Sequence, residues 1–391
     1  VIDGRRLYKV MVSAGAGQDN PADRQRFIDS FLLLAPPLPP AAPPATPPSD
    51  QTAAVATGGA WIADARTGCR VWNAEPEDGE SIRWSGACAD GLAQGPGVLE
   101  WFKDGKPTGR YEGEYRAGKM NGRGKYADDK GEVYEGEFRD NDRTGHGVLN
   151  YANGDRYEGS LINGGRSGQG VMVYANGARY EGPFLDNKRH GHGVMTFADG
   201  MRYEGDFRDN QMAGRGILSY KSGNRYEGSF ADDKRHRKGT FTWANGNRFV
   251  GEFQSGKMSG HGIWTSPTGH RIEAEFHDNM TGTGVWTAPN GDRYQGTFVD
   301  AKFDGRGVYV YASGGRYEGQ FRAGHIEGRG VMTLASGDRL EGEFHGDKPN
   351  GPGVLSRTDG TTYTGNWRNG CFSNGTVWFS VQSTPEVCGF K

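Results

Sequence analysis

The four cysteines are the residues of this sequence whose chemistry follows most directly from their positions. Cys69 and Cys88 are 19 residues apart, and Cys371 and Cys388 are 17 apart. Four cysteines allow three connectivities, and the short separations favour Cys69 with Cys88 and Cys371 with Cys388. Each bridge would contribute roughly 3 kcal/mol and would place the chain in an oxidising compartment. A zinc site is the alternative, although no Cys-x-x-Cys or paired histidine supports it.

Nothing else in the sequence has the types and spacing of a catalytic site. His190 and His192 are two residues apart, but repetition of the surrounding pattern explains them better than metal binding does. The sequence contains no P-loop and no Gly-x-Ser-x-Gly motif. Acidic pairs such as Asp128-Asp129 and Asp232-Asp233 lack the spacing of a calcium loop. We therefore expect no catalytic residue, no cofactor and no metal, and hence no enzyme.

Composition indicates an unusual type of core. The chain has 391 residues, of which 66 are glycine, and its 9 Trp, 17 Tyr and 19 Phe make disorder improbable. Large rings and glycines replace the Leu, Ile and Val of a conventional two-layer domain. The 46 basic residues nearly balance the 48 acidic ones, so no nucleic-acid partner is expected.

The first sixty residues differ in composition from the rest of the chain. Asp3-Gly4 is typical of a hairpin turn, and the pattern after Asn20 predicts a helix over 21–34. Residues 36–48 contain eight prolines, which is typical of a semi-rigid spacer. We interpret 1–35 as the hairpin-plus-helix tail of an incomplete domain and 36–60 as a Pro/Ala-rich linker. Because the chain begins with Val1, any signal peptide is not in this sequence.

A repeat of 23 residues runs through the remainder. A degenerate first copy starts at Trp84. From Tyr111 the tripeptide Tyr-Glu-Gly recurs at this interval, and weaker copies fill the gaps up to Tyr363. In the unit that starts at Tyr134, the pattern Tyr-x-Gly-x-Phe alternates with period 2. A polar loop, Gly-His-Gly, a short apolar stretch and the turn Asn153-Gly154 follow. Each unit is therefore predicted to be one β-hairpin.

The consensus Tyr-Glu-Gly-x-Phe…Gly-x-Gly-Val…Asn-Gly-x-Arg resembles the MORN (membrane occupation and recognition nexus) repeat family, of a bacterial extracytoplasmic type. The resemblance covers about 295 residues, from Trp84 to near Phe379. It implies an all-β fold, an elongated single-sheet solenoid of consecutive antiparallel hairpins. We assign 61–110 to an N-terminal cap with the degenerate first repeat, 111–362 to the regular array, and 363–391 to a partial repeat with a C-terminal cap.

Three departures from the consensus concentrate in the middle of the array. Arg237 replaces the first glycine of Gly-x-Gly, Ala274 replaces the glycine of Tyr-Glu-Gly, and Ile272 replaces the leading ring. The interval from Ile272 to Tyr294 is 22 residues, which indicates a one-residue deletion between Phe276 and Gly282. An interruption of the ladder between 226 and 290 is therefore an open alternative.

Alternation along a strand assigns the side chains to two faces. The leading ring, the glycine two residues later and the ring four residues later share one face, so we expect rings to pack over glycines. This face is predicted to form an exposed groove lined by Tyr111, Tyr134, Phe138, Tyr157, Tyr180, Phe184, Tyr203, Phe207, Tyr226, Phe230, Tyr294, Phe298, Tyr317 and Phe321.

The opposite face is predicted to carry two polar rows. The residues that flank the leading ring are ten arginines, from Arg110 to Arg339, and nine glutamates, from Glu112 to Glu341. The two charges nearly cancel along this ladder, whereas a phosphate-binding stripe would require arginines in excess. A second row, between the paired glycines, is mostly basic and is the better candidate for attracting anions; its members are Arg123, His146, Gln169, His192, Arg215, Lys238, His261, Thr283, Arg306 and Arg329.

These observations predict a non-enzymatic scaffold that mediates protein–protein interaction or self-association through the aromatic and glycine groove. The partner would be another protein or a second copy of the chain. The alternative, which the family name suggests, is a membrane surface or phospholipid headgroups; a second alternative is cell-wall glycan stacked on the rings. The cysteines predict an extracytoplasmic location, periplasmic or secreted.

Overall fold

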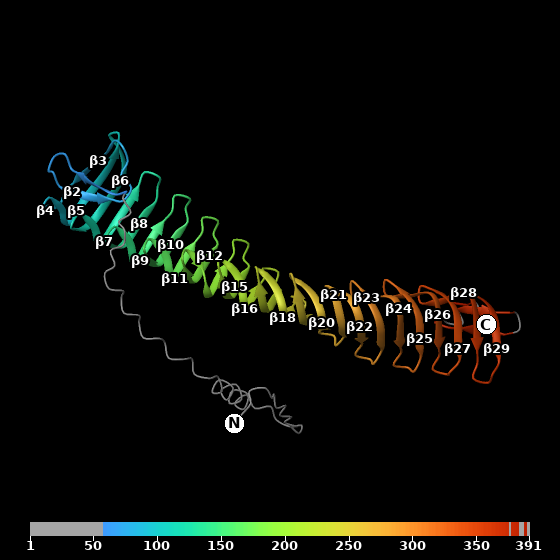
Figure 1. Cartoon of the computed structure of the whole chain (residues 1–391). Helices are drawn as coiled ribbons and strands as arrows, with labels where there is room; N and C mark the ends of the chain where they lie inside the picture. The colour runs from blue at the N-terminus through green and yellow to red at the C-terminus, as the bar shows by residue number, and fades with distance from the viewer. Residues whose placement is uncertain (1–57, 375–376, 383–386, 389–391) are drawn as a thin grey trace, which may run out of the picture. The chain divides into compact units, whose positions relative to one another are not determined.

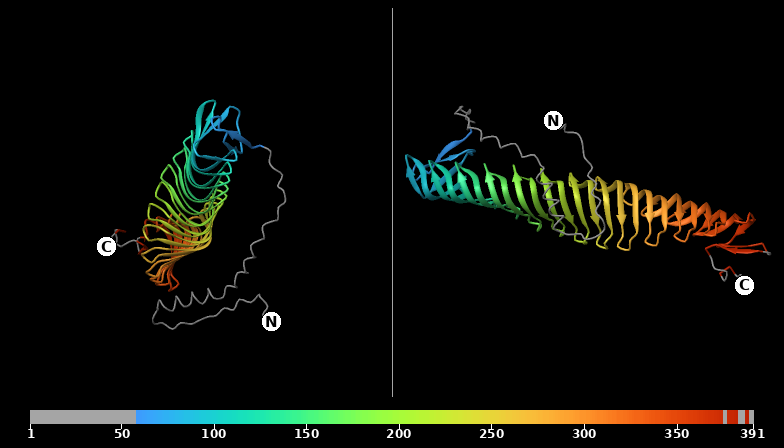
Figure 2. Two further views of the ribbon diagram at one scale, coloured as in Figure 1. Left: turned by 90° about the vertical axis from the view of Figure 1, so that its left-hand side faces the viewer. Right: turned by 90° about the horizontal axis from the view of Figure 1, so that it is seen from below.

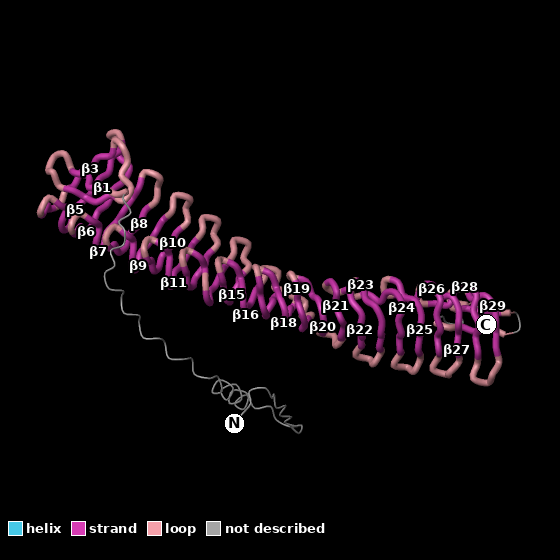
Figure 3. Tube along the Cα trace, in the orientation of Figure 1, coloured by secondary structure: helices cyan, strands magenta, loops and turns pink. Residues whose placement is uncertain are grey.

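The computed structural model describes residues 58–374, 377–382 and 387–388. The hairpin, helix and proline-rich segment expected before residue 58 lie outside the described residues. Throughout the described part the regular elements are all strands, as Figure 3 shows, so the predicted all-β fold is confirmed.

Four short strands precede the array. They are β1 (Ala60–Ala63), β2 (Arg70–Asn73), β3 (Glu80–Trp84) and β4 (Ala87–Ala89). Strand β1 pairs antiparallel with β2, and both β3 and β4 pair with the first long strand that follows them.

Twenty-five strands form the array itself. They are β5 (Leu92–Lys103), β6 (Lys106–Arg116), β7 (Lys119–Asp128), β8 (Val133–Arg139), β9 (Asp142–Asn150), β10 (Arg156–Ile162), β11 (Gly165–Val173), β12 (Arg179–Leu185), β13 (Lys188–Arg189), β14 (Gly191–Thr196), β15 (Arg202–Arg208), β16 (Gln211–Ser219), β17 (Arg225–Ala231), β18 (Lys234–Thr242), β19 (Arg248–Gln254), β20 (Lys257–Thr265), β21 (Arg271–Asp278), β22 (Thr281–Thr287), β23 (Arg293–Val299), β24 (Lys302–Val310), β25 (Arg316–Arg322), β26 (His325–Thr333), β27 (Arg339–His345), β28 (Lys348–Ser356) and β29 (Thr362–Trp367). A separate hairpin of β30 (Cys371–Ser373) and β31 (Trp378–Ser380) follows.

The strands from β1 to β29 belong to one sheet of 29 strands. From β5 onward, each strand pairs antiparallel with its neighbours in the sequence, and β13 and β14 together form one arm of a hairpin. Figure 1 shows the strands stacked in chain order along an elongated, open ribbon, and Figure 2 shows the same stack from two further sides. The strand pairings of the array join only neighbours in the sequence, as in other solenoids.

The hairpin register brings two glycines opposite each other in each repeat. In the hairpin of β8 and β9, Tyr134 pairs with Leu149 and Gly136 with Gly147, and a β-bulge follows Gly136. A Cβ atom added to Gly136 would lie 2.7 Å from Tyr134 Cζ and 2.7 Å from the Cα of Gly147. The ring thus occupies the space that two absent side chains leave, which confirms the predicted packing of ring on glycine.

The rings form a row along the array. Tyr134 and Phe138 lie edge to face, with centroids 5.1 Å apart, and Phe138 makes the same contact with Tyr111 of the preceding repeat. Edge-to-face pairs add about 0.5–1.5 kcal/mol to area burial. Each ring therefore couples its own hairpin to its neighbour, and the row replaces the core of a two-layer domain.

Side chains at both edges of the sheet also join successive repeats. At one edge, Asn187 Oδ1 accepts a hydrogen bond of 2.8 Å from the Arg166 amide, 21 residues earlier. At the other edge, Asp155 Oδ1 accepts one of 2.8 Å from the Ala175 amide, 20 residues later. Loop residues thus contribute to the coupling between repeats.

The ladder continues through the irregular middle of the array. Strand β21 pairs with both β20 and β22, so the alternative of an interrupted sheet is wrong. Ile272 and Ala274 depart from the consensus together: no ring fills the space there, and a Cβ on Gly284 would lie 2.5 Å from the Ala274 Cβ. The missing residue shortens the hairpin, and the bulge moves to the turn, after Phe276.

Arg237 has a left-handed backbone, with φ of 52°, where the equivalent Gly145 has φ of 61°. An L-residue pays about 1–2 kcal/mol for this conformation. We expect Arg237→Gly to raise the free energy of unfolding by about 1 kcal/mol, seen as a higher urea midpoint. The control is Lys238→Gly, because Lys238 has no positive φ and its loss should lower the midpoint. An unchanged urea midpoint for Arg237→Gly would contradict the inference that the Arg237 backbone is strained.

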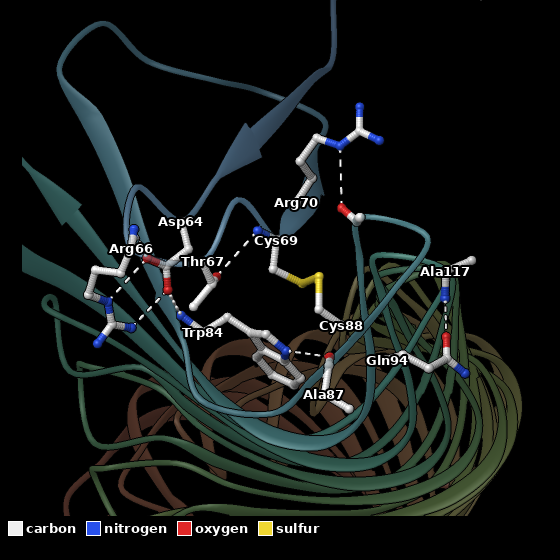
Figure 4. Close-up of a disulfide and its surroundings, with 11 residues drawn as sticks. Asp64, Arg66, Thr67, Cys69, Arg70, Trp84, Ala87, Cys88, Gln94 and Ala117 are labelled. Carbon is white, nitrogen blue, oxygen red and sulfur yellow. Dashed lines mark hydrogen bonds and ion pairs between the residues drawn. A yellow bond between two sulfur atoms is a disulfide. The ribbon is translucent and has the colours of Figure 1, made fainter.

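Disulfides join the predicted pairs at both ends of the array. Cys69 bonds to Cys88, with Cα atoms 5.8 Å apart, and Cys371 bonds to Cys388, with Cα atoms 5.5 Å apart. Figure 4 shows the first of these bonds beside Trp84, whose indole Nε1 donates to the Ala87 carbonyl over 2.9 Å. The pairing predicted from the spacing is confirmed.

A buried carboxylate orders the N-terminal end. Asp64 is 1% exposed, and its Oδ2 accepts hydrogen bonds of 2.8 Å from the Trp84 amide and from Arg66 Nη2 (Figure 4). The Arg66 guanidinium, followed by the Trp84 amide, holds the pKa of the Asp64 carboxyl well below its usual value, against the effect of burial. Asp64 therefore connects the loop before Cys69 to the strand that carries the first ring.

Candidate interaction surface

The rings that were expected to line an exposed groove are in the interior. Their exposed fractions lie between 0 and 4%; they are Tyr111, Tyr134, Phe138, Tyr157, Tyr180, Phe184, Tyr203, Phe207, Tyr226, Phe230, Tyr294, Phe298, Tyr317 and Phe321. The reason is that each ring fills the space over its glycines and is covered by the next ring. In some repeats an arginine adds to the cover: the Arg166 guanidinium lies 5.8 Å from the Tyr157 centroid and 5.4 Å from that of Phe184.

Two open hollows lie on the other face, which we call the charged face. It carries the arginines and glutamates that flank the leading rings, together with the valines opposite those glutamates. One hollow, of about 760 Å³, includes Ile217, Thr240 and Val250, and the other, of about 930 Å³, includes Val308 and Val331. Both follow the line of paired glycines, where backbone forms the floor between two rows of side chains.

The arginine and glutamate ladder of the charged face consists of ion pairs within each strand. Eight arginines contact the glutamate two residues later, with N–O distances of 2.6–2.9 Å; the pairs are Arg110–Glu112, Arg156–Glu158, Arg179–Glu181, Arg202–Glu204, Arg225–Glu227, Arg271–Glu273, Arg316–Glu318 and Arg339–Glu341. All are exposed, so each adds little stability. Their effect is to cancel charge along the face.

The second row, which was expected to attract anions, is only partly free to do so. Its members lie on the charged face opposite residues of the neighbouring strand, and several of those residues are acidic. His192 faces Asp206, with Nδ1 3.2 Å from Oδ1, and Arg329 contacts Glu343 over 3.7 Å. Arg306, by contrast, faces the neutral Gln320.

The sequence reasoning missed a row of rings that is only half buried. Tyr151, Tyr174, Phe197, Tyr220 and Trp243 pack at the edge of the buried row. The available signal was the large apolar residue that precedes most of the Asn-Gly or equivalent turns. A third hollow, of about 610 Å³, lies near the N-terminal end of the face that carries the rings, and Trp72, Trp101 and Tyr126 line it.

Within residues 58–374 and the short described stretches after them, no three His, Cys, Asp or Glu side chains group closely enough to hold a metal ion. The same part of the chain has no helix with the length and apolar character needed to cross a membrane.

Comparison with solved structures finds only distant similarity. One match is the TCP domain of SAS-4 (dCPAP) of Drosophila melanogaster in complex with a proline-rich motif of Ana2 (dSTIL), with 15% identity, a TM-score of 0.26, and coverage of 40% of this chain and 84% of that one. Another is the G-box domain of the microcephaly protein CPAP, with 15% identity, a TM-score of 0.25, and coverage of 51% and 99%. These scores support no statement about function.

Sequence comparison identifies the repeat directly. No curated protein matches the chain. The family model described as the MORN repeat matches eleven consecutive segments, which are 111–133, 134–156, 157–179, 180–202, 203–225, 226–248, 249–271, 273–293, 294–316, 317–339 and 341–362. These segments coincide with the hairpins described above and cover more than half of the chain. The chain therefore belongs to the MORN-repeat family.

Proposed function

We propose that this protein is a scaffold that binds an extended segment of another protein, or of a second copy of itself, along the charged face. The MORN repeat is a non-enzymatic type of repeat associated with protein or membrane interaction. The observation that carries the proposal is the pair of hollows that follow the glycine line. Branched side chains and glycine backbone recur there at the repeat interval, and an extended polypeptide presents side chains at regular intervals too.

The charge distribution supports protein over membrane as the partner. Anionic lipids select clusters of unpaired basic residues. Most of the ladder arginines are paired with glutamate instead, so the face offers little net positive charge. Glycan stacking on the predicted groove rings is disfavoured because those rings are buried.

We further propose that segments 61–110 and 363–391 are caps that protect the ends of the sheet, and that the protein works in the periplasm or outside the cell. Open sheet edges invite pairing with other chains. The two disulfides stabilise both ends of the array and favour an oxidising compartment.

Filling one hollow tests the proposed function. We expect Val308→Trp to abolish binding of peptides that are selected from a displayed random library on the full chain, because the indole would occupy the hollow. Val148→Trp is the matched control, because Val148 has the equivalent position in a repeat outside both hollows. Peptides that bind Val308→Trp and the parent equally would overturn the proposal, as would capture of phosphatidylserine vesicles with no peptide selected.

A further inference from the structure

The ladder of the charged face lacks a carboxylate at one place beside the larger hollow. Gln295 lies where most repeats have glutamate, and Arg293 Nη2 donates to Gln295 Oε1 over 3.2 Å instead of forming an ion pair. Gln295 itself lines the hollow. A neutral amide cannot cancel the charge of Arg293, which is exposed.

A second cation approaches the same point from the other strand. Gln295 pairs with Val308 across the β23–β24 hairpin, and Arg306 is two residues from Val308 on the same face. Arg293 is two residues from Gln295 on the opposite side, and Arg306 lines the same hollow as Gln295. Within the described part of the chain, neither arginine has an ion pair with a carboxylate.

The other carboxylates of this hollow are already paired. Glu318 contacts Arg316 over 2.6 Å and Glu341 contacts Arg339 over 2.9 Å. Glu343 contacts Arg329 over 3.7 Å. Asp304, at the hairpin edge, accepts the Ala323 amide over 3.2 Å. The positive charge at Arg293 and Arg306 is therefore local, at one end of a hollow with apolar valines and a glycine floor.

We propose that Arg293, Gln295 and Arg306 form a carboxylate-binding site that takes a glutamate or aspartate side chain of an extended polypeptide lying in this hollow. The inference rests on the proposed function and names the chemistry of the partner. Guanidinium and carboxylate make strong charge-assisted hydrogen bonds, and the Gln295 amide adds a neutral donor. An acidic side chain restores the pairing that eight of the other repeats contain internally.

The test uses the full chain and a fluorescein-labelled peptide of alternating valine and glutamate, with anisotropy as the readout. A peptide with glutamine in place of glutamate is the matched probe. We expect the glutamate peptide to bind about five- to tenfold more tightly, and more so at low salt. Gln295→Glu should remove this preference, because it supplies the ladder carboxylate that folded repeats already tolerate. Gln169→Glu adds the same charge on the same face far from the hollow, and should leave the preference unchanged.

The variants separate this proposal from the proposed function. One informative result is that Val308→Trp binds neither peptide while Gln295→Glu and Arg306→Gln leave the preference for the glutamate peptide unchanged. That result would support the hollow as the peptide-binding site and would overturn the carboxylate site. Equal binding of the two peptides to the parent chain would also overturn the site. Phosphatidylserine vesicles are tested as the competing ligand. If the vesicles bind, Arg306→Gln abolishes that binding, and the glutamate peptide does not bind, the site would be a lipid site and the proposal would be overturned.

Discussion

Replacing Gly136 by alanine is expected to destabilise the array by about 2–4 kcal/mol, although the change adds only one methyl group. The new Cβ would lie 2.7 Å from both Tyr134 Cζ and the Cα of Gly147. Neither can retreat easily, because the ring is fully buried and the opposite strand is held by its ladder. The measurement is urea unfolding by circular dichroism, with hydrogen exchange to locate the repeats that open.

The chain itself supplies the rescue for this variant. Ile272 and Ala274 show that a smaller leading residue and an alanine are compatible within one hairpin. Tyr134→Ile alone should lose stability by leaving a cavity. The double variant Tyr134→Ile/Gly136→Ala should therefore be more stable than the sum of the two single losses, by about 1–3 kcal/mol.

A control separates steric overlap from the general effect of alanine in a strand. Gly109 also lies in a strand without a positive φ, but its added Cβ would meet other atoms only at 3.5 Å or more. Gly109→Ala should be close to neutral. If Gly136→Ala were equally harmless, or if the single losses simply added in the double variant, the ring-on-glycine account of the core would be wrong.

Sequence periodicity was sufficient to predict the hairpins and the two faces, and the short cysteine separations were sufficient to predict both disulfides. Tyr134, Gly136 and Phe138 alternate with period 2, and this alone places them on one face. Burial of that face was not predictable in the same way. It depends on contacts between repeats, such as Phe138 against Tyr111, and on cover from residues with no fixed identity, such as Arg166. The sequence pattern shows which residues share a face, but it does not show which residues cover that face.

The candidate site was misplaced for the same reason. Aromatic rows suggest a binding surface when they are exposed, and the interpretation of this sequence assumed that a one-layer sheet exposes both faces. In the structure the hollows lie on the charged face, where the decisive residue, Gln295, is an exception to the repeat. The consensus identifies the residues that build the scaffold. Residues that depart from it, such as Gln295, give one repeat a different binding chemistry from the next.

Alkaline unfolding is the second large effect that we expect. Burial raises the pKa to about 12 for Tyr134, Tyr157, Tyr180, Tyr226, Tyr294 and Tyr317. An unfolded tyrosine has a pKa near 10, so the folded state holds these protons more tightly. This contribution to stability is complete below about pH 10, and it is lost as the pH rises through about 12. A folded pKa of about 12 against about 10 corresponds to roughly 3 kcal/mol for each ring, so the sum over the six rings is on the order of 15 kcal/mol.

The hydroxyls of these buried rings are also hydrogen-bonded. Tyr157 donates to the Ser160 carbonyl over 2.8 Å, and Tyr134 donates to the Glu137 carbonyl over 3.0 Å. A phenolate can make neither bond, and it would lie buried beside a carbonyl oxygen. Ionisation of one ring therefore favours the opening of its hairpin, which removes the cover from its neighbours.

Phenylalanine variants isolate this effect because the chain already accepts Phe249 as a leading ring, fully buried over Gly262. Replacing Tyr157, Tyr180 and Tyr226 by phenylalanine should cost about 1 kcal/mol each at neutral pH through the lost hydrogen bonds. The same triple variant should lose less stability between pH 10 and 12. Urea midpoints at each pH, measured together with tyrosinate absorbance, give both quantities. If the tyrosinate absorbance that the triple variant lacks forms near pH 10 in the parent, while circular dichroism stays unchanged, water reaches these three hydroxyls. The buried row would then not be the element that holds the array together.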